Sequence, residues 1–440
     1  MAYTIRRVAV IGAGTMGAAI AAHLANAGFQ VDLLDIPPKT LTPEEAAKGL
    51  TLEHPVVRNR IVNAGLERAK KARPAAFFTE DMARRIRTGN TEDHWDRLRE
   101  ADWIIEAVVE DLAVKQEVMA RIEAVRRPKA IVTTNTSGLP LREIGAGRSP
   151  EFLAHFAGTH FFNPPRYLKL VELIPGPATR PEVLDALERV LEVRLGKRVV
   201  RAKDTPNFIA NRIGFIAGAF IGRYALEHGY TVEEVDALAG PLIGRPKTAH
   251  FRLLDLVGLD VAAYVGRHSM DALRHDPFVA LVRDSRMNAV MAAMVERGWL
   301  GNKAGQGFYK KVETPEGTQY WPLNLETLEH EPPKKPRWDS VGRALKIEDL
   351  RERLRFMVAQ EDRAGQFVRS ILDFYLAYAA YVAPEVADDI VAIDNAIRWG
   401  FNYELGPFET WDALGVAETA ARIEAAGWPL AEWVREFLAA

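Results

Sequence analysis

The stretch Arg7-Val-Ala-Val-Ile-Gly12-Ala-Gly14-Thr-Met-Gly17 decides the fold of this chain. A short apolar run ends in a glycine-rich turn, an alanine-rich segment continues to Asn26, and a second apolar run ends at Asp35. Apolar runs of this length indicate strands, and the longer segment between them has the period of a helix. Two parallel strands need such a helical crossover. The stretch therefore predicts a βαβ unit that opens a parallel sheet.

The spacing Gly12-x-Gly14-x-x-Gly17 is typical of a dinucleotide-binding turn. Glycine lets the backbone turn tightly and lets a pyrophosphate approach, and the helix start at Thr15 and Met16 offers amide donors to the anion. Asp35 ends the next strand about 20 residues on, where a carboxylate binds ribose hydroxyls and repels a 2′-phosphate. We therefore predict NAD rather than NADP, against the alternative of a purely structural glycine turn.

Strand and helix signals alternate over the rest of the first 202 residues, after a basic helical arm expected at about 38–87. We expect strands at 103–109, 130–135 and from Thr159, with helices at about 93–101 and 114–125. Repeated βα units with apolar strands predict an α/β Rossmann-type, doubly wound sheet. We assign residues 1–202 to this domain.

The remainder of the chain is expected to form two all-α domains. Lys203-Asp-Thr205-Pro206 predicts a helix start, because Thr205 can cap a first turn that tolerates Pro206. A stretch rich in proline and charge interrupts the helical pattern. The expected parts are a helical domain at 203–328, a linker at 329–340 and a second helical domain at 341–440.

The two helical domains repeat each other. Val235-Asp236 reappears as Ile393-Asp394, and Arg252-Leu-Leu-Asp-Leu-Val-Gly258 corresponds to Glu409-Thr-Trp-Asp-Ala-Leu-Gly415. The aspartates and glycines recur at an offset of 157 or 158 residues. A fixed offset of this kind indicates duplication, so we expect the two copies to pack together within one chain.

Composition excludes several classes of protein. The 440 residues carry 57 Lys and Arg against 59 Asp and Glu, a net charge of -2 that gives no basic field for nucleic acid. The absence of cysteine excludes thiolate catalysis and cysteine-ligated metal, and we expect no metal site. No apolar stretch approaches the ~20 residues of a membrane span and the start leaves no room for a signal peptide, so the cytoplasm is the expected location.

His160-Phe-Phe-Asn-Pro-Pro-Arg-Tyr-Leu-Lys-Leu-Val-Glu172 reads as a strand, a proline-broken turn and a second strand. If the strands form a hairpin, His160 and Glu172 can meet, and an imidazole oriented by a carboxylate is a general base near neutral pH. The alternative is a structural histidine and a solvated glutamate. The position after a βα array favours the catalytic reading, since ligands bind beyond the carboxyl ends of parallel strands.

Three other groups of polar residues have a structural and a functional reading. Asn135-Thr-Ser137 closes a strand, where its side chains either contact a ligand or shape a turn. Asn211 lies early in the helix expected after Pro206, where nothing local decides its role. Lys70 and Lys71 belong to the basic arm, which is usually a solvated helix face but which can also grip a phosphorylated ligand.

Together these motifs resemble the L-3-hydroxyacyl-CoA dehydrogenase family in their order along residues 5 to 310. The stretches that carry the resemblance are Gly12 to Gly17, Glu106-Ala-Val-Val-Glu110-Asp-Leu-x-Val-Lys115, Asn135-Thr-Ser137, His160-Phe-Phe-Asn163-Pro with Glu172, Lys203-Asp-Thr-Pro-x-Phe-x-x-Asn211-Arg, and Lys303-x-Gly-x-Gly-Phe-Tyr309. Gly138 departs from the family pattern, where a second serine is frequent, and so does Pro165-Arg166.

The resemblance implies that His160 takes a proton from the 3-hydroxyl of the substrate while hydride leaves C3 for the nicotinamide, and that Glu172 holds the imidazole. By the same matching, Ser137 and Asn211 would contact the substrate. Residues implied at the cofactor site are Glu110, Lys115, Asn163 and Lys303. The helical arm would help to bind coenzyme A, which gives Lys70 and Lys71 a phosphate-binding role.

The phrase from Gly400 to Asp412 resembles the duplicated C-terminal domain of fused β-oxidation proteins, which also carry an enoyl-CoA hydratase module. No such module is found in these 440 residues, so the chain is expected to be a free-standing dehydrogenase or a part of a longer fused protein. A hydratase module and a thiolase are possible partners. Duplication favours a monomer with an internal pseudo-dimer, and a homodimer is the alternative.

Two other functions are alternatives. One is a related NAD-dependent dehydrogenase of a hydroxy acid or sugar acid, and the other is a non-catalytic dinucleotide-binding scaffold, because a fold by itself does not fix function. The presence of His160, Glu172, Ser137 and Asn211 together argues against the scaffold. The sequence therefore predicts oxidation of L-3-hydroxyacyl-CoA to 3-ketoacyl-CoA with NAD.

Overall fold

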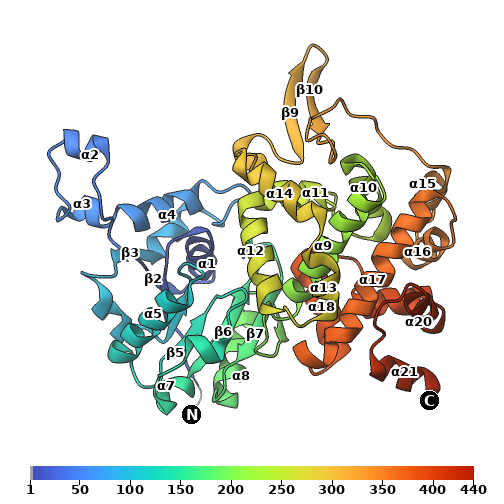
Figure 1. Cartoon of the computed structure of the whole chain (residues 1–440). Coiled ribbons are helices and arrows are strands. Elements are labelled where there is room, and N and C mark those ends of the chain that lie inside the picture. The colour runs from blue at the N-terminus through green and yellow to red at the C-terminus, as the bar shows by residue number, and fades with distance from the viewer. Residues whose placement is uncertain (1–2) are drawn as a thin grey trace. The chain divides into compact units, whose positions relative to one another are not determined.

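The computed structural model of the chain describes residues 3–440. The chain forms two compact units, of which the first ends at Phe208 and the second runs from Ile209 to Ala440. The first unit contains the large sheet and the second is mainly helical, as Figure 1 shows. Within residues 3–440, none of the helices has the length and apolar character that crossing a membrane requires.

An eight-stranded sheet forms the centre of the first unit, in the order β3-β2-β1-β4-β5-β6-β7-β8. The strands are β1 (Arg7–Ile11), β2 (Gln30–Asp35), β3 (Ile86–Asn90), β4 (Trp103–Glu106), β5 (Ile131–Thr134), β6 (Phe156–Phe161), β7 (Leu170–Pro175) and β8 (Arg198–Arg201). Neighbouring strands are parallel except for β6 and β7. Because the chain starts at β1 and winds outward in both directions, the predicted doubly wound α/β fold is confirmed.

Helices cover both faces of this sheet. They are α1 (Thr15–Asn26), α2 (Pro43–Ala47), α3 (Pro55–Arg58), α4 (Arg60–Lys70), α5 (Leu112–Val125), α6 (Leu141–Ile144), α7 (Pro150–Leu153) and α8 (Pro181–Arg189), with 3₁₀ turns at Glu80–Arg85 and Trp95–Glu100 and a π turn at Val190–Arg194. Apolar side chains of α1, α4 and α8 share one core with the sheet. The alanine-rich sequence of α1 lets this helix lie close to the strands, and most of its residues are buried.

The basic segment from Pro38 to Arg87 differs in part from the predicted helical arm. Of its helices, α4 packs against α1, and a Cβ atom at Gly65 would lie 2.3 Å from the carbonyl oxygen of Ala13. α4 is therefore part of the fold, whereas α2 and α3 extend away from the sheet in Figure 1. The edge strand β3 was missed because Ile86-Arg-Thr-Gly-Asn90 has a single strongly apolar residue and so gives no strand pattern.

The second unit begins with six helices and a hairpin. These elements are α9 (Ala210–Glu227), α10 (Val232–Leu238), α11 (Phe251–Val257), α12 (Leu259–Ala272), α13 (Pro277–Arg283), α14 (Arg286–Glu296), β9 (Tyr309–Thr314) and β10 (Gly317–Pro322), with 3₁₀ turns at Pro241–Ile243 and Asn302–Ala304. The hairpin differs from the all-α domain that we expect at 203–328. β9 and β10 pair antiparallel and project from the helices in Figure 1.

Seven further helices complete the unit after an irregular segment at 323–338. They are α15 (Asp339–Ala344), α16 (Leu350–Val358), α17 (Arg363–Val386), α18 (Ile390–Phe401), α19 (Pro407–Leu414), α20 (Val416–Ala425) and α21 (Glu432–Ala439). α17 is buried along most of its length and packs against α9, where the rings of Phe220 and Phe374 stack at 3.9 Å. The two helical parts, which we predicted as separate domains, thus share one core within a single compact unit.

The duplication predicted from sequence is visible in local structure. α9 contacts α18, and α17 contacts α10, so that the first helix of each copy packs on the second helix of the other. Gly258 and Gly415 precede α12 and α20 with closely similar backbone angles, φ 100° and ψ 126° against φ 85° and ψ 120°. Glycine adopts this positive-φ conformation without strain, which explains why it recurs at both positions.

One predicted helix start is wrong. α9 begins at Ala210, and the hydroxyl of Thr205, which was expected to cap it, is buried without a hydrogen-bond partner in the described structure. Asn207 and Phe208 adopt φ values of 63° and 52°, so the chain makes a left-handed turn before the helix. A threonine–proline pair favours a helix start locally, but this turn displaces the start toward Ala210.

Candidate active site

The three glycines of the fingerprint meet different surroundings at the end of β1. Gly12 has φ +100°, and a Cβ atom there would lie 2.4 Å from the carbonyl oxygen of Ala107. A Cβ at Gly17 would lie 1.8 Å from the carbonyl oxygen of Gly12. At Gly14 a Cβ would meet no atom within 4 Å. Gly12 and Gly17 are therefore required by packing, while Gly14 faces open space suited to close approach of a phosphate.

The start of α1 presents its amide groups without a competing anion. Gly14 is the N-cap residue, so no side chain caps the helix, and Thr15 and Met16 begin a first turn that lacks acidic residues. The helix N-terminus carries a partial positive charge. Asp35, the last residue of β2, accepts hydrogen bonds from the backbone N–H groups of Ala13 at 2.6 Å and Ile36 at 2.7 Å. This arrangement fits a dinucleotide, with phosphates at α1 and a ribose at Asp35.

His160 and Glu172 form a direct pair. They lie opposite each other in the β6–β7 hairpin, and Nδ1 of His160 is 2.7 Å from Oε2 of Glu172. His160 is 5% exposed and Glu172 is fully buried. The imidazole ring lies against the rings of Phe162 and Phe208, with centroid distances of 4.5 Å and 5.7 Å. A buried carboxylate on Nδ1 fixes the ring orientation, as a general base requires.

Ser137 lies in the turn after β5, at the same edge of the sheet. Glu110 binds this turn, because its Oε1 accepts hydrogen bonds from the hydroxyl of Thr136 at 2.6 Å and the backbone N–H of Ser137 at 2.9 Å. Asn135 connects the turn to β6, since its Oδ1 accepts from the N–H of Phe161 at 3.0 Å. The turn before Ser137 is thus tied to the strand of His160.

Gly138 fits a narrow space in this turn. A Cβ atom at Gly138 would lie 2.6 Å from Oδ1 of Asn207. A serine at this position would force the Asn207 side chain to move. A side chain at position 138 therefore fits only if the Asn207 amide shifts.

Lys115 is buried rather than open to a ligand. Its Nζ lies 2.8 Å from Glu106 and 3.2 Å from Glu110, and the residue is 1% exposed. Burial by itself would lower the pKa of Lys115, but the two carboxylates raise it above its ordinary value. Burial would raise the pKa of Glu110, and Lys115 with the bonds from Thr136 and Ser137 lowers it instead. Lys115 and Glu110 therefore both carry charge at neutral pH.

Glu106 was not singled out by sequence reasoning. It ends β4, is fully buried, and accepts hydrogen bonds from Thr134 at 2.6 Å and from the N–H of Val108 at 2.8 Å. The available signal was a carboxylate that ends an apolar strand, followed nine residues later by a lysine in a helix. Such a pairing indicates a buried ion pair that supports a site.

Asn163 is exposed in the turn between β6 and β7. Lys197 and Arg166 tie this turn to its surroundings. Lys197 is buried and donates to the carbonyl groups of Pro165 and Leu168, and burial lowers its pKa to about 8. Arg166 donates to the carbonyl groups of Ala75 and Phe77, at 2.7 Å and 2.8 Å. The hairpin turn is thereby joined to the loop that follows α4.

Lys70 and Lys71 lie at the C-terminal end of α4, where both are exposed. Lys70 pairs with Glu67 at 2.6 Å. Exposed pairs of this kind are weak, so the ammonium group remains available to a stronger anionic partner. The structure does not bring the two lysines into contact with the His160–Glu172 pair.

Asn211 and Lys303 belong to the second unit. Asn211 lies in the first turn of α9 and is 8% exposed. Lys303 pairs with Asp260 at the start of α12, at 2.5 Å. The glycines of the Lys303 motif have a structural role, since a Cβ at Gly307 would lie 2.0 Å from Oδ1 of Asp255.

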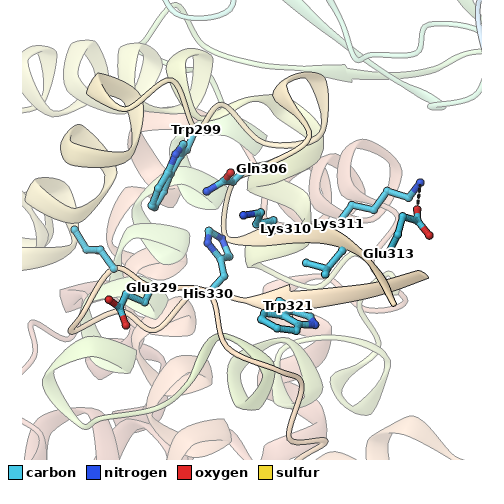
Figure 2. Close-up of a pocket in the computed structure, with 10 residues that line it drawn as sticks. Trp299, Gln306, Lys310, Lys311, Glu313, Trp321, Glu329 and His330 are labelled. Atoms are coloured by element: carbon cyan, nitrogen blue, oxygen red, sulfur yellow. Dashed lines mark ion pairs between the residues drawn. The ribbon is translucent and has the colours of Figure 1, made fainter. Parts of the chain in front are cut away.

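A surface groove beside the β9–β10 hairpin contains other residues. Figure 2 shows Trp299, Trp321 and His330 around it, with Lys310 and Glu329 nearby and an ion pair between Lys311 and Glu313. Among the described residues that line this groove, none is a predicted site residue. The groove therefore does not belong to the candidate active site.

A dinucleotide turn and an imidazole–carboxylate pair at one edge of a doubly wound sheet define an NAD-dependent dehydrogenase. Two family models match the chain, "3-hydroxyacyl-CoA dehydrogenase, NAD binding domain" over residues 7–205 and "3-hydroxyacyl-CoA dehydrogenase, C-terminal domain" over residues 208–311. The chain belongs to the 3-hydroxyacyl-CoA dehydrogenase family, and NAD is its cofactor. The family resemblance predicted from sequence is thus confirmed.

Similar proteins cover the chain to different extents. This chain is 45% identical over 99% of its length to a "Probable 3-hydroxyacyl-CoA dehydrogenase" of Bacillus subtilis, and it spans 54% of that protein. A "Probable 3-hydroxyacyl-CoA dehydrogenase" of Deinococcus radiodurans is 43% identical over 70% of this chain and 84% of that protein. The chain thus spans about half the length of the Bacillus relative.

A solved structure shares the fold over the full chain. The crystal structure of 3-hydroxybutyryl-CoA dehydrogenase from Escherichia coli has a TM-score of 0.66 with 24% identity and covers 98% of both chains. At this identity the likeness concerns the fold alone. It includes the second helical copy, which lies beyond the family-model matches.

Proposed function

We propose that this protein oxidises L-3-hydroxyacyl-CoA to 3-ketoacyl-CoA with NAD in fatty acid β-oxidation. The observation that carries the proposal is the 2.7 Å contact between His160 and Glu172 at the sheet edge, in a chain of this family. The reaction removes a proton from an alcohol and a hydride from the same carbon. NAD supplies the hydride acceptor, and the chain must supply a base.

His160 acts as the general base. Glu172 accepts the hydrogen of Nδ1, so the lone pair of Nε2 is left to take the proton of the 3-hydroxyl. As the imidazole gains charge, the buried carboxylate stabilises it. The aromatic rings of Phe162 and Phe208 exclude water from the imidazole, which strengthens this electrostatic effect.

The family match supports the other roles that we propose. Ser137 and Asn211 contact the substrate near its hydroxyl and thioester, and Lys70 and Lys71 bind phosphates of coenzyme A. Gly14, the α1 amide groups and Asp35 hold NAD, with Thr15 and Met16 in the first turn. Lys115 and Glu110 act indirectly, because Lys115 is buried against Glu110, and Glu110 binds the turn at Ser137. Asn163 and Lys303 complete the proposed cofactor site.

We also propose partners, a location and an oligomeric state. The chain spans 54% of its Bacillus relative, which is compatible with an enoyl-CoA hydratase module or a thiolase as partners. We assign the protein to the cytoplasm. The internal duplication favours a monomer over a homodimer.

The test is a spectrophotometric assay of NADH oxidation with acetoacetyl-CoA, comparing wild type, His160→Gln and His155→Gln. His155 is a matched control because it is buried near the same strand, and its Nδ1 contacts the carbonyl of Glu151 at 2.9 Å. We expect His160→Gln to lower kcat by about 10²- to 10⁴-fold and His155→Gln to retain most activity. Normal turnover by His160→Gln would overturn the mechanism.

The alternative substrate class is tested with the same enzyme. Turnover of 3-hydroxybutyryl-CoA is compared with turnover of free 3-hydroxybutyrate and of a sugar acid at equal concentration. The proposal predicts a strong preference for the thioester. A higher kcat/KM for either free acid would instead assign a hydroxy-acid or sugar-acid dehydrogenase.

A further inference from the structure

Arg212 follows Asn211 in the first turn of α9 and is one of the most buried charges in the second unit. Its side chain is 2% exposed. The guanidinium donates to the hydroxyl of Tyr378 at 2.7 Å, to Asp276 at 3.0 Å, and to both carboxylate oxygens of Glu385 at 3.1 Å each. A guanidinium held by four hydrogen bonds has little freedom to move.

The acceptors come from two helices other than α9. Asp276 caps α13, accepting from the N–H of Phe278 at 2.9 Å, and it also accepts from the hydroxyl of Tyr378 at 3.1 Å. Tyr378 and Glu385 lie seven residues apart on one face of α17. Arg212, Tyr378 and Asp276 thus form a closed triangle of hydrogen bonds. Figure 1 shows α9, α13 and α17 close together, in agreement with their contacts.

No side chain caps the start of α9. Ile209, at the N-cap position, has an apolar side chain that cannot accept a hydrogen bond from the helix. The two residues before it are in left-handed conformations. Because Arg212 is adjacent to Asn211, a guanidinium held on α13 and α17 restricts rotation of the first turn of α9, which carries the Asn211 side chain.

We propose that Tyr378 and Glu385 are positioning residues for Asn211, acting through Arg212. Both belong to the second helical copy, in which we place no residue that touches substrate or cofactor. The second copy is then part of the machinery that orients the substrate, in addition to packing on the first. The inference rests on the proposed function, because it assumes that Asn211 contacts the acyl-CoA.

The charges of the cluster agree with a permanent support. Asp276 is 8% exposed and balances the buried guanidinium, while Glu385 is about half exposed and adds a second carboxylate. Burial would lower the pKa of Arg212, but Tyr378, Glu385 and Asp276 raise it. The guanidinium stays charged, and removal of any one acceptor leaves it under-compensated in a buried place.

The experiment compares Tyr378→Phe with Asp373→Asn. Asp373 is a matched control on the same helix, buried and paired with Arg422 of α20 at 2.8 Å and 2.9 Å. For both variants we measure kcat and KM with acetoacetyl-CoA, the affinity for NADH by fluorescence, and thermal unfolding. Tyr378→Phe keeps the ring and removes only the hydroxyl.

We expect Tyr378→Phe to lower kcat/KM for acetoacetyl-CoA by about tenfold, mainly through kcat, with NADH affinity unchanged. Asp373→Asn is expected to change kcat/KM by less than about twofold even if it lowers the unfolding temperature as much. Glu385→Gln, at a half-exposed position that tolerates change, keeps one oxygen acceptor and should give an intermediate loss. Equal kinetics for Tyr378→Phe and Asp373→Asn would overturn the inference, as would normal kinetics in both Tyr378→Phe and Glu385→Gln.

Turnover by the wild type distinguishes the proposed dehydrogenase function from the positioning role of Tyr378 and Glu385. An inactive wild type would overturn the proposed function, and the inference with it. An active wild type with Tyr378→Phe indistinguishable from the control would leave the proposed function standing and overturn the inference alone.

Discussion

Asp236 and Asp394 hold equivalent positions in the two helical copies. Asp236 accepts hydrogen bonds from the backbone N–H groups of His250, Phe251 and Arg252 at the start of α11, and Asp394 accepts from Phe408 and Glu409 at the start of α19. Each carboxylate therefore fixes the helix that follows it. Aspartate is favoured here because a carboxylate satisfies amide groups that a helix start leaves open.

The first prediction concerns the pH dependence of stability at Asp394. Burial, with repulsion from Glu409 and Asp412 and despite the amide hydrogen bonds, raises its pKa to about 7 from 3.8. Between these values the folded protein holds a proton that the unfolded chain has released, so stability falls as pH rises through this window. Asp394→Asn removes this dependence while keeping an oxygen acceptor.

The measurement is urea unfolding of wild type and Asp394→Asn at pH 5 and pH 7. The wild type should lose about 2 kcal/mol relative to the variant between these pH values. Glu436→Gln, which alters an exposed carboxylate of α21 that does not contribute to the Asp394 shift, serves as the control and should keep the pH dependence of the wild type. A pH-independent difference would contradict the assigned pKa.

The second prediction separates orientation of the imidazole from its chemistry. Glu172→Gln keeps the size of a fully buried side chain and removes its charge. The amide no longer stabilises a protonated His160, so we expect kcat to fall about 10- to 100-fold while NADH affinity is kept. Stopped-flow NADH oxidation and fluorescence titration measure the two quantities. An unchanged kcat would remove Glu172 from the mechanism.

The third prediction contrasts two glycines of the fingerprint. Gly17→Ala places a methyl group where the nearest atom is 1.8 Å away, so we expect a loss of about 1–3 kcal/mol or failure to fold. Gly14→Ala meets no atom within 4 Å, so stability should stay within about 0.5 kcal/mol. Gly14→Ala should nevertheless weaken NADH binding, because its methyl group would occupy the space that we assign to the phosphates.

Denaturant unfolding and NADH titration check both glycine variants. Gly14→Ala is expected to be as stable as wild type but to bind NADH at least tenfold more weakly. A Gly14→Ala variant with wild-type affinity would show that the phosphates lie elsewhere.

The fourth prediction concerns cofactor choice. Asp35→Asn keeps an acceptor for the N–H of Ala13 but removes the charge that repels a 2′-phosphate. We expect the KM for NADH to rise and the preference for NADH over NADPH to fall by about tenfold. The KM for acetoacetyl-CoA is the internal control. A preference for NADPH in the wild type would contradict the role given to Asp35.

The sequence was most informative where local pattern and chemistry agree. The glycine spacing and the strand alternation predicted the doubly wound sheet, and the hairpin pattern predicted that His160 and Glu172 would meet. The duplication could be predicted because few other residues can replace an aspartate that caps a helix or a glycine with positive φ, so both recur in the two copies. These features depend on neighbours in sequence or on strict residue requirements.

Features that depend on tertiary contacts were not predictable. β3 forms because it pairs in parallel with β2, although the residues of β3 give no strand pattern. β9 begins where Asp255 accepts the N–H groups of Phe308 and Tyr309, which lie more than fifty residues away in sequence. Lys115 was expected at a ligand, but Glu106 and Glu110 hold it within the core.

The covalent joining of the two helical copies changes how they can evolve. Tyr309 donates to Asp236 in the first copy at 2.9 Å. Among the described residues of the second copy, Asp394 accepts from the backbone N–H groups of Phe408 and Glu409 and not from a tyrosine hydroxyl. In a symmetric assembly of identical chains, every substitution appears on both sides of the interface at once. In this chain a substitution changes one copy only. The first copy can therefore keep the residues that we propose for substrate binding, while the second copy changes into a structural support for the first.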